Sequence, residues 1–226
     1  MSHDLIIYGG GIIGGALALA LKESGLSMAL VEARASPALA PSEIWDTRMY
    51  AVSPGSVAFL TRLGIWDKTN PRIQAIREMQ VWGDDGTASI VFDPEALGLA
   101  ELGFIVEASF MQQRIWQALR NQANLELIYP IQAEQLYIGT QGAQLNLSDG
   151  RQLTGRLLIG ADGAESWVRA AARMETDSLP YDQVGIVANF ECEFTHDGAA
   201  RQWFQENGVL AWLPMPGKRI SIVWSL

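Results

Sequence analysis

Hydrophobic positions near the start of the chain form two short runs, separated by glycines and by helix-forming residues. Residues 4–8 (DLIIY) and 28–31 (MALV) are apolar runs of the length typical of strands. Residues 16–23, which lie between the two runs, are rich in strong helix formers. The pattern predicts a strand, a tight turn, a helix and a second strand.

Two other interpretations of this region fail. Residues 5–21 carry no charged side chain, but a membrane-spanning helix needs about 20 apolar residues, and the glycines at the centre of this run are poor helix formers. An export signal normally opens with positive charge, whereas only Met1, Ser2, His3 and Asp4 precede the run. We therefore expect neither a membrane anchor nor an exported protein.

Alternating and amphipathic segments continue along the chain. A helix is predicted over residues 53–63, with Ser53 as its cap and Pro54 at its first position, after a long loop over 33–47. Three alternating segments punctuated by TQG and SDG turns predict a β-meander. The predicted elements after the first helices are a two-stranded hairpin within 77–92, a strand at 103–106, a helix at 110–121, and the meander strands 132–139, 143–147 and 151–159.

From about residue 175 the pattern changes to long strand candidates, at 184–194, 200–205, 209–214 and 219–226. The chain therefore reads as an α/β nucleotide-binding domain followed by the start of a mostly β region. The last strand candidate stops at Leu226 without a turn or tail, so we expect the chain to be an N-terminal fragment.

Composition excludes several classes of function. The chain has 226 residues, 49% of them hydrophobic, and a formal net charge of −9 without a basic cluster, which argues against binding to nucleic acid or to anionic lipid by charge alone. A single cysteine, Cys192, excludes an intrachain disulfide and suits a reducing cytoplasm. The two histidines, His3 and His196, are isolated, so we expect no histidine metal site. Chemistry carried by a bound cofactor remains.

The glycines of the first turn have the spacing of a dinucleotide-binding site. Gly9, Gly11 and Gly14 form G-x-G-x-x-G between the first strand and helix, and Glu32 ends the second strand. In such a site the diphosphate lies on the N–H groups of the helix start, and an acid about 20 residues farther on binds the ribose 2′-hydroxyl. The alternative is a plain β-α-β unit in which Glu32 is merely solvated. Gly10 and Gly15 are additional glycines that the spacing does not require.

Three other residues each have a structural and a functional interpretation. Asp162, followed by Glu165, has the spacing of a capping box and can equally lie beside a ligand at a helix start. Arg48 is either a surface arginine or a guanidinium that binds a diphosphate. Gln112 belongs either to a solvated helix face or to a helix start that faces a cofactor.

Taken together, several stretches resemble one enzyme family. GGGIIGG with Glu32, RMYAVSPGSVAFLTRLGIWD and GADGAESWVR are similar to the single-component flavin monooxygenases related to para-hydroxybenzoate hydroxylase, and most of all to the bacterial ubiquinone-biosynthesis hydroxylases (the 2-octaprenyl-phenol hydroxylase family). FDPEALGLAELGFIVE, RQWFQENGVLAWLP and SIVWSL look like the same subfamily. The similarity extends over essentially the whole chain.

The resemblance implies an α/β fold, in which a Rossmann-like FAD-binding domain, made of a parallel sheet and a β-meander, precedes an incomplete, mostly β substrate domain. Residues 1–175 would form the first domain and 176–226 the start of the second. A β-hairpin around residues 76–106 is inserted in the first domain, and it belongs either to that domain or to the substrate domain. A second flavin signature of the family, a Gly-Asp followed by Ala-Ala-His, is absent from these residues, so we expect the fragment itself to be inactive.

The resemblance also assigns site residues and chemistry. It implies FAD, with Gly9, Gly11 and Gly14 at the diphosphate, Glu32 at the ribose, Arg48 at the phosphates, Asp162 in the Asp-Gly motif that serves FAD and NAD(P)H, and Gln112 at a helix start beside the cofactor. NAD(P)H would be the co-substrate, and a polyprenylated phenol and O2 would be the substrates of a hydroxylation in ubiquinone biosynthesis. We assign no catalytic residue.

The sequence leaves other functions, the cellular location and the assembly state open. An NAD-linked dehydrogenase and a non-catalytic assembly module of a ubiquinone-biosynthesis complex are the competing functions. The protein is expected in the cytoplasm, either free or peripheral to the inner membrane. Association with a ubiquinone-biosynthesis complex and a homo-oligomeric state are further options.

Overall fold

The computed structural model describes residues 2–37, 44–84 and 86–226, and the chain divides into two compact units. The first unit comprises Met1–Ala40, Leu63–Ile65 and Gln112–Ser178, and the second comprises Pro41–Arg62, Trp66–Met111 and Leu179–Leu226. Each unit is therefore assembled from stretches that lie far apart in the sequence. No helix in the described part of the chain is long and apolar enough to cross a membrane.

The first unit is built on a six-stranded sheet with the order β8-β2-β1-β11-β10-β9. The pairs β8·β2, β2·β1 and β1·β11 are parallel, and β11·β10 and β10·β9 are antiparallel. A parallel sheet extended by a β-meander is the architecture that we predicted. Its strands are β1 (Ser2–Tyr8), β2 (Met28–Val31), β8 (Leu125–Ile128), β9 (Ala133–Gly139), β10 (Gly142–Leu147) and β11 (Gln152–Gly160).

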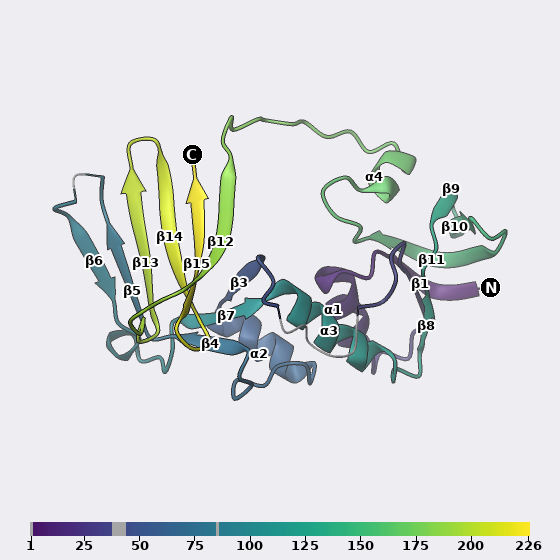
Figure 1. Ribbon diagram of the computed structural model, residues 1–226. Helices are drawn as coiled ribbons and strands as arrows, with labels where there is room; N and C mark the ends of the chain where they lie inside the picture. Colours follow the sequence, from purple (N-terminus) through teal and green to yellow (C-terminus); the bar gives the residue numbers. More distant parts are fainter. Residues whose placement is uncertain (1, 38–43, 85) are drawn as a thin grey trace. The chain divides into compact units, whose positions relative to one another are not determined.

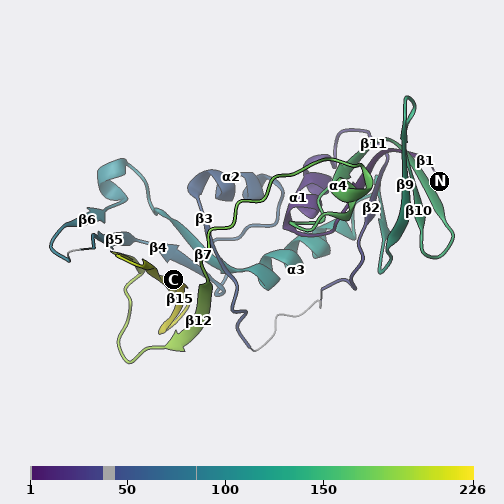
Figure 2. The ribbon, with the colours of Figure 1, turned by 90° about the horizontal axis from the view of Figure 1, so that it is seen from above.

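Helices lie on both faces of this sheet. Helices α1 (Ile12–Ala20) and α3 (Ala108–Leu119) lie side by side on one face, and the short α4 (Trp167–Ala171) follows β11 on the opposite face (Figures 1 and 2). All four residues of β2 are buried, as expected for a parallel strand covered on both faces. The core on the α4 side includes Tyr8, Leu145 and Val168.

Most predicted elements of the first unit are confirmed, and two are corrected. The first helix begins at Ile12, not at residue 16, because the helix starts inside the glycine run with Gly11 as its N-cap. β8 was not predicted, because its four residues (LELI) are too few to show a clear period. As predicted, the uncharged run at residues 5–21 forms a strand, a turn and a helix, not a membrane-spanning helix.

The described residues of the second unit form two sheets, helix α2 and the first residues of α3. The larger sheet has the order β12-β15-β14-β13-β5-β6 and the smaller has the order β3-β7-β4. Ile76, Ile105 and Ala200 form a buried cluster with contributions from both sheets. The elements are β3 (Met49–Val52), α2 (Pro54–Arg62), β4 (Ile73–Ile76), β5 (Glu78–Trp82), β6 (Ser89–Phe92), a 3₁₀ turn (Glu95–Leu97), β7 (Gly103–Glu107), β12 (Gly185–Glu191), β13 (Ala199–Gln205), β14 (Gly208–Met215) and β15 (Arg219–Ser225).

The predicted hairpin joins the larger sheet through β5, which pairs in parallel with β13. Its Asp-Asp-Gly turn includes residue 85, which lies outside the described residues, as does part of the predicted loop at 33–47. The prediction of helix α2 is confirmed, and the backbone N–H of Ser56 donates to Oγ of Ser53 (3.3 Å) as expected of a cap. Strands β3 and β4 were missed.

Aromatic side chains form a row across the larger sheet. Trp82 and Trp203 are directly opposite in the register and stack with their ring centroids 5.0 Å apart. Trp212 meets Trp203 edge to face at 4.9 Å. Such pairs stabilise a sheet beyond the area that they bury.

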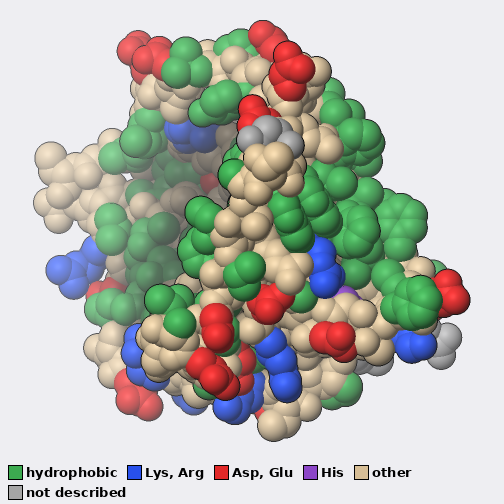
Figure 3. Space-filling model, turned by 90° about the vertical axis from the view of Figure 1, so that its left-hand side faces the viewer, with side chains coloured by type: hydrophobic (Ala, Val, Ile, Leu, Met, Phe, Trp, Pro, Cys, Tyr) green, Lys and Arg blue, Asp and Glu red, His purple; other side chains and the backbone are tan. Residues whose placement is uncertain are grey.

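The surface is mixed in character. Hydrophobic side chains occupy much of the face in Figure 3, and the acidic and basic groups there are interspersed. Three consecutive residues of β6, Ile90, Val91 and Phe92, are 60%, 56% and 42% exposed.

Candidate functional site

The glycine turn after β1 is closely packed against the end of β11. Gly9 has a φ of +112°, and a Cβ built on it would lie 2.4 Å from the carbonyl oxygen of Ala161. A Cβ on Gly14 would lie 1.9 Å from the carbonyl oxygen of Gly9. Only glycine fits at either position. Gly9 needs a backbone conformation that other residues rarely adopt, and at Gly14 the Gly9 carbonyl leaves no room for a side chain.

Gly11 is different, because the space beside it is open. Among the described residues other than its chain neighbours, none has an atom within 4 Å of a Cβ built on Gly11, which is the N-cap of α1. No side chain in the described part of the chain caps this helix, and its first turn contains no acidic residue. The free N–H groups and the positive end of the helix dipole therefore remain available to an anion, as a dinucleotide diphosphate requires.

Glu32 lies directly beside the glycine turn. Its Oε2 accepts from the backbone N–H of Gly10 at 2.6 Å, and its Oε1 accepts from the backbone N–H of Arg34 at 2.8 Å. Each carboxylate oxygen has further acceptor capacity, so a ribose hydroxyl can still donate to it. The predicted proximity of the acid to the glycine turn is therefore present, and Glu32 also shapes the turn itself.

Helix α3 contacts the same turn from another side. The side-chain amide of Gln112 and the indole Nε1–H of Trp116 both donate to the carbonyl oxygen of Gly10, the latter at 2.9 Å. Sequence reasoning singled out Gln112 but missed Trp116. The four-residue spacing of the two, which places them on one helix face, was the signal that could have found it.

Asp162 stabilises the turn after β11, in a different manner from the predicted capping box. The N-cap of α4 is Ser166, whose Oγ accepts from the backbone N–H of Arg169 at 3.0 Å. Oδ1 of Asp162 accepts from the Ser166 hydroxyl at 2.5 Å, and Oδ2 accepts from the backbone N–H of Val168 at 3.1 Å. Glu165 is exposed and is not part of this cap. The capping-box prediction is wrong because the helix begins four residues later than expected.

Arg48 belongs to the second unit. Its backbone N–H donates to Oδ1 of Asp46 at 3.0 Å, and its carbonyl oxygen accepts from the backbone N–H of Ala108 at 3.0 Å. Asp46 also accepts from the backbone N–H of Ser109 through Oδ2 at 2.9 Å. The Arg48 backbone is therefore fixed at the start of β3, and the residue is exposed.

The first unit brings together Gly9, Gly11, Gly14, Glu32 and Gln112 around one turn, and Asp162 lies at the neighbouring strand end, since β1 and β11 are adjacent and parallel. A backbone hydrogen bond from Ala161 N–H to Tyr8 O (2.7 Å) joins the two strand ends. Within the described residues, no group of three or more His, Cys, Asp or Glu side chains is placed to hold a metal ion.

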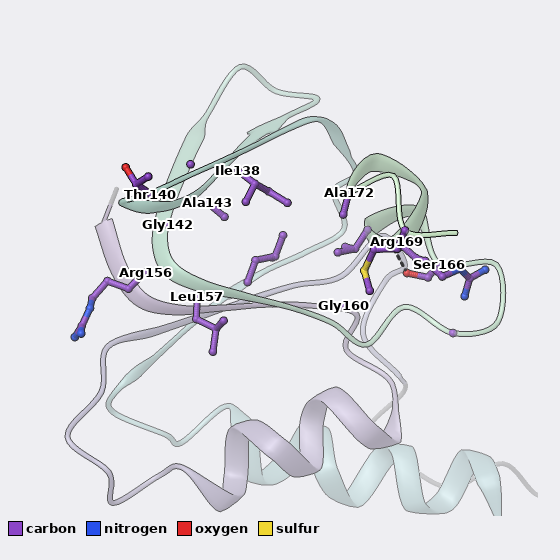
Figure 4. Close-up of a pocket in the computed structure, with 15 residues that line it drawn as sticks. Ile138, Thr140, Gly142, Ala143, Arg156, Leu157, Gly160, Ser166, Arg169 and Ala172 are labelled. Atoms are coloured by element: carbon purple, nitrogen blue, oxygen red, sulfur yellow. Dashed lines mark hydrogen bonds between the residues drawn. The ribbon is translucent and has the colours of Figure 1, made fainter. Parts of the chain in front are cut away.

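A hollow of the first unit lies between the meander and α4, apart from the glycine turn (Figure 4). Its volume is about 650 Å³, and its lining is mostly apolar. Leu157, which helps to line it, is 57% exposed. Residues 157–160 of β11 pair with β1, whereas β10 pairs with β11 no farther than Gly155. The glycine turn is not part of this lining.

The combination of a parallel sheet, a glycine turn between β1 and α1, and an acid at the end of β2 defines a dinucleotide-binding fold. The sequence profile of the FAD binding domain family matches residues 2–226. The chain belongs to this family, and FAD is its cofactor. The uncapped start of α1 and the open space at Gly11 fit the diphosphate of FAD.

The curated relatives of this chain carry the names of a narrower group of enzymes. The chain is 35% identical over 223 residues to 3-demethoxyubiquinol 3-hydroxylase of Escherichia coli (strain K12), which covers 98% of this chain and 56% of the relative. It is 34% identical over 222 residues to ubiquinone hydroxylase UbiL of Rhodospirillum rubrum, covering 98% of this chain and 51% of the relative. The chain thus spans about half the length of the curated relatives that it matches.

Solved structures confirm the fold. PqsL of Pseudomonas aeruginosa, described as a probable FAD-dependent monooxygenase, superposes with a TM-score of 0.82 at 22% identity, over 100% of this chain and 61% of its own. HpxO of Klebsiella pneumoniae, solved with FAD and uric acid, gives a TM-score of 0.73 at 18% identity, over 100% and 56% of the two chains. At these identities the likeness establishes the fold alone.

Proposed function

We propose that this chain is the FAD-binding part of an NAD(P)H-dependent monooxygenase that hydroxylates a polyprenylated phenol in ubiquinone biosynthesis. The observation that carries the proposal is the 35% identity to a demethoxyubiquinol hydroxylase over 98% of the chain. The glycine turn supports it, because the turn has the geometry that the cofactor requires. Bound FAD would supply the activation of O2, which side chains alone cannot perform.

In this proposal the residues of the chain bind and orient the cofactor. The N–H groups at Gly11 and the start of α1 hold the diphosphate, Gly9 allows the tight turn, Gly14 allows α1 to pack closely against it, and Glu32 accepts from the adenosine ribose. Arg48 donates to a phosphate, as a guanidinium fork does best. Asp162 and Gln112 lie along the cofactor, and the strands of the second unit contribute to the phenol site. No acid–base residue is proposed, because positioning and exclusion of water are the main contributions of the protein.

Gly11→Ala separates cofactor binding from folding. We expect the free energy of unfolding to change by less than about 0.5 kcal/mol, because the added methyl group meets no atom within 4 Å. The Kd for FAD should rise at least about tenfold, because that methyl group takes the space of the diphosphate. Isothermal titration of the complete gene product with FAD, beside urea unfolding, measures both quantities.

The control for this experiment is Gly55→Ala in α2, where a built Cβ also meets nothing within 4 Å. It should leave the Kd for FAD unchanged. If Gly11→Ala binds FAD as tightly as the wild type, the diphosphate does not lie at the start of α1.

The proposed function is tested by the visible spectrum of the complete gene product and by its NADPH oxidation with and without a polyprenyl phenol. We expect flavin absorbance, faster NADPH oxidation with the phenol, and a product heavier by one oxygen atom. Flavin-free protein that reduces NAD with an alcohol substrate would favour a dehydrogenase. Flavin-free protein that only co-purifies with other ubiquinone-biosynthesis proteins would favour an assembly module.

The location of the protein follows from its substrate in this proposal. A polyprenylated phenol resides in the bilayer, so we propose that the enzyme contacts the inner membrane from the cytoplasm, through apolar contacts or partner proteins, since its net charge of −9 opposes attraction to anionic lipid. Flotation with vesicles that contain the phenol, and sedimentation to determine the oligomeric state, test these points.

A further inference from the structure

We infer that Trp116, together with Gln112, is a positioning residue that holds the glycine turn in its binding conformation before the cofactor arrives. We call these two side chains the Gly10 clamp. The inference rests on the proposed FAD site, and it assigns a role to Gly10 and Gly15, the two glycines that the dinucleotide spacing leaves unexplained.

Hydrogen bonds hold both ends of Gly10. Its carbonyl oxygen accepts from Nε1 of Trp116 at 2.9 Å and from the amide of Gln112, and its N–H donates to Glu32 at 2.6 Å. Two donors on one carbonyl oxygen satisfy both of its lone pairs. The backbone that leads into Gly11 is therefore oriented by side chains from α3 and from the end of β2.

The shape of α3 explains the additional glycines. A Cβ built on Gly10 would lie 2.8 Å from Cζ2 of Trp116, and a Cβ built on Gly15 would lie 2.4 Å from Cγ2 of Ile115. Both are closer than a side chain tolerates, so α3 can lie against the turn only where these residues are glycine. The glycine run thus meets two requirements, one set by the diphosphate and one set by α3.

The Trp116 ring is itself held in place. Its exposed fraction is 2%, and it packs edge to face on Tyr129 with the ring centroids 4.7 Å apart. A buried indole in this setting cannot turn its N–H away from Gly10. These contacts order the turn, which reduces the conformational entropy lost when a diphosphate binds.

The test is Trp116→Phe in the complete gene product, with two readouts. The first is the hydrogen-exchange rate of the Gly10 amide, which donates to Glu32, measured by NMR without ligand. We expect it to rise at least about fivefold, because one hydrogen bond to the Gly10 carbonyl is lost, while the smaller phenyl ring still fills most of the space. The second is the Kd for FAD, which should rise by about five- to tenfold.

Two further variants keep the test decisive if Trp116→Phe folds poorly. Gln112→Met removes the other donor to Gly10 and should give the same two effects, whereas Gln117→Met, on the same helix and contacting Arg114, should give neither. Trp82→Phe, which makes the same replacement in the second unit, is the control for Trp116→Phe. Rescue is also expected: Trp116→Phe should recover part of the flavin affinity that Gly10→Ala loses, because it removes the closest atom.

The outcomes separate the inference from the proposed function. Amide exchange that stays within about twofold of wild type in both clamp variants overturns the inference, whatever the flavin affinity. Exchange that rises equally in the control variants also overturns it, because the effect is then not specific to the clamp. A wild-type protein that binds no FAD contradicts the proposed function, while the exchange rates still decide whether the clamp orders the turn.

Discussion

Gly14→Ala is expected to destabilise the first unit by at least about 3 kcal/mol and to abolish retention of FAD. The Cβ would lie 1.9 Å from the carbonyl oxygen of Gly9, which is backbone and cannot rotate away. This clash is relieved only if α1 moves away from β1, so the turn loses the conformation that binds the diphosphate. Urea unfolding followed by circular dichroism, and flavin absorbance of the purified complete gene product, measure the two effects.

Gly55→Ala again serves as the matched control and should keep both wild-type stability and flavin. The contrast with Gly11→Ala is informative, because that variant should keep its stability and lose only flavin affinity. A Gly14→Ala protein that is yellow and as stable as the wild type would contradict the described packing of α1 against the turn.

The second large effect is expected at a buried ion pair of the second unit. Glu107 is 0% exposed and accepts from Arg72 through both oxygens, Nε to Oε2 at 2.5 Å and Nη2 to Oε1 at 2.8 Å. It also accepts from the backbone N–H of Asp46 at 2.8 Å. Glu107→Ala should therefore destabilise the protein by about 3–5 kcal/mol, because it removes the carboxylate that is ion-paired with the largely buried Arg72 guanidinium.

Chemical unfolding monitored by tryptophan fluorescence measures this loss. The matched control is Glu191→Ala, which breaks the Arg219–Glu191 pair (3.1 Å) at a carboxylate side chain that is 80% exposed, and which should change stability by less than about 1 kcal/mol. Similar losses in the two variants would show that burial does not determine the strength of the Arg72–Glu107 pair.

Features that depend on neighbours in the sequence could be predicted from the sequence. The strand, glycine turn and helix at the N-terminus follow from local composition, and the parallel sheet follows from the β-α-β pattern. Proximity of Glu32 to the glycine turn was predictable as well, since parallel neighbours bring the carboxyl ends of β1 and β2 to the same edge.

Features that depend on distant contacts could not be predicted in this way. β5 pairs with β13, far along the chain, so no local pattern places the hairpin in the larger sheet. The role of Trp116 depends on a hydrogen bond to a residue 106 positions away. Ser166 was overlooked as a cap because Asp162, with Glu165 three residues later, matches the capping box, whereas the helix begins after Ser166.

The short distance between Gly10 and the Trp116 ring has an evolutionary consequence. Because a side chain at position 10 would need the space that the Trp116 ring fills, substitutions at the two positions should be correlated across homologous chains. Chains with alanine at the position of Gly10 should have a side chain smaller than tryptophan at the position of Trp116, and a tryptophan there should be accompanied by glycine.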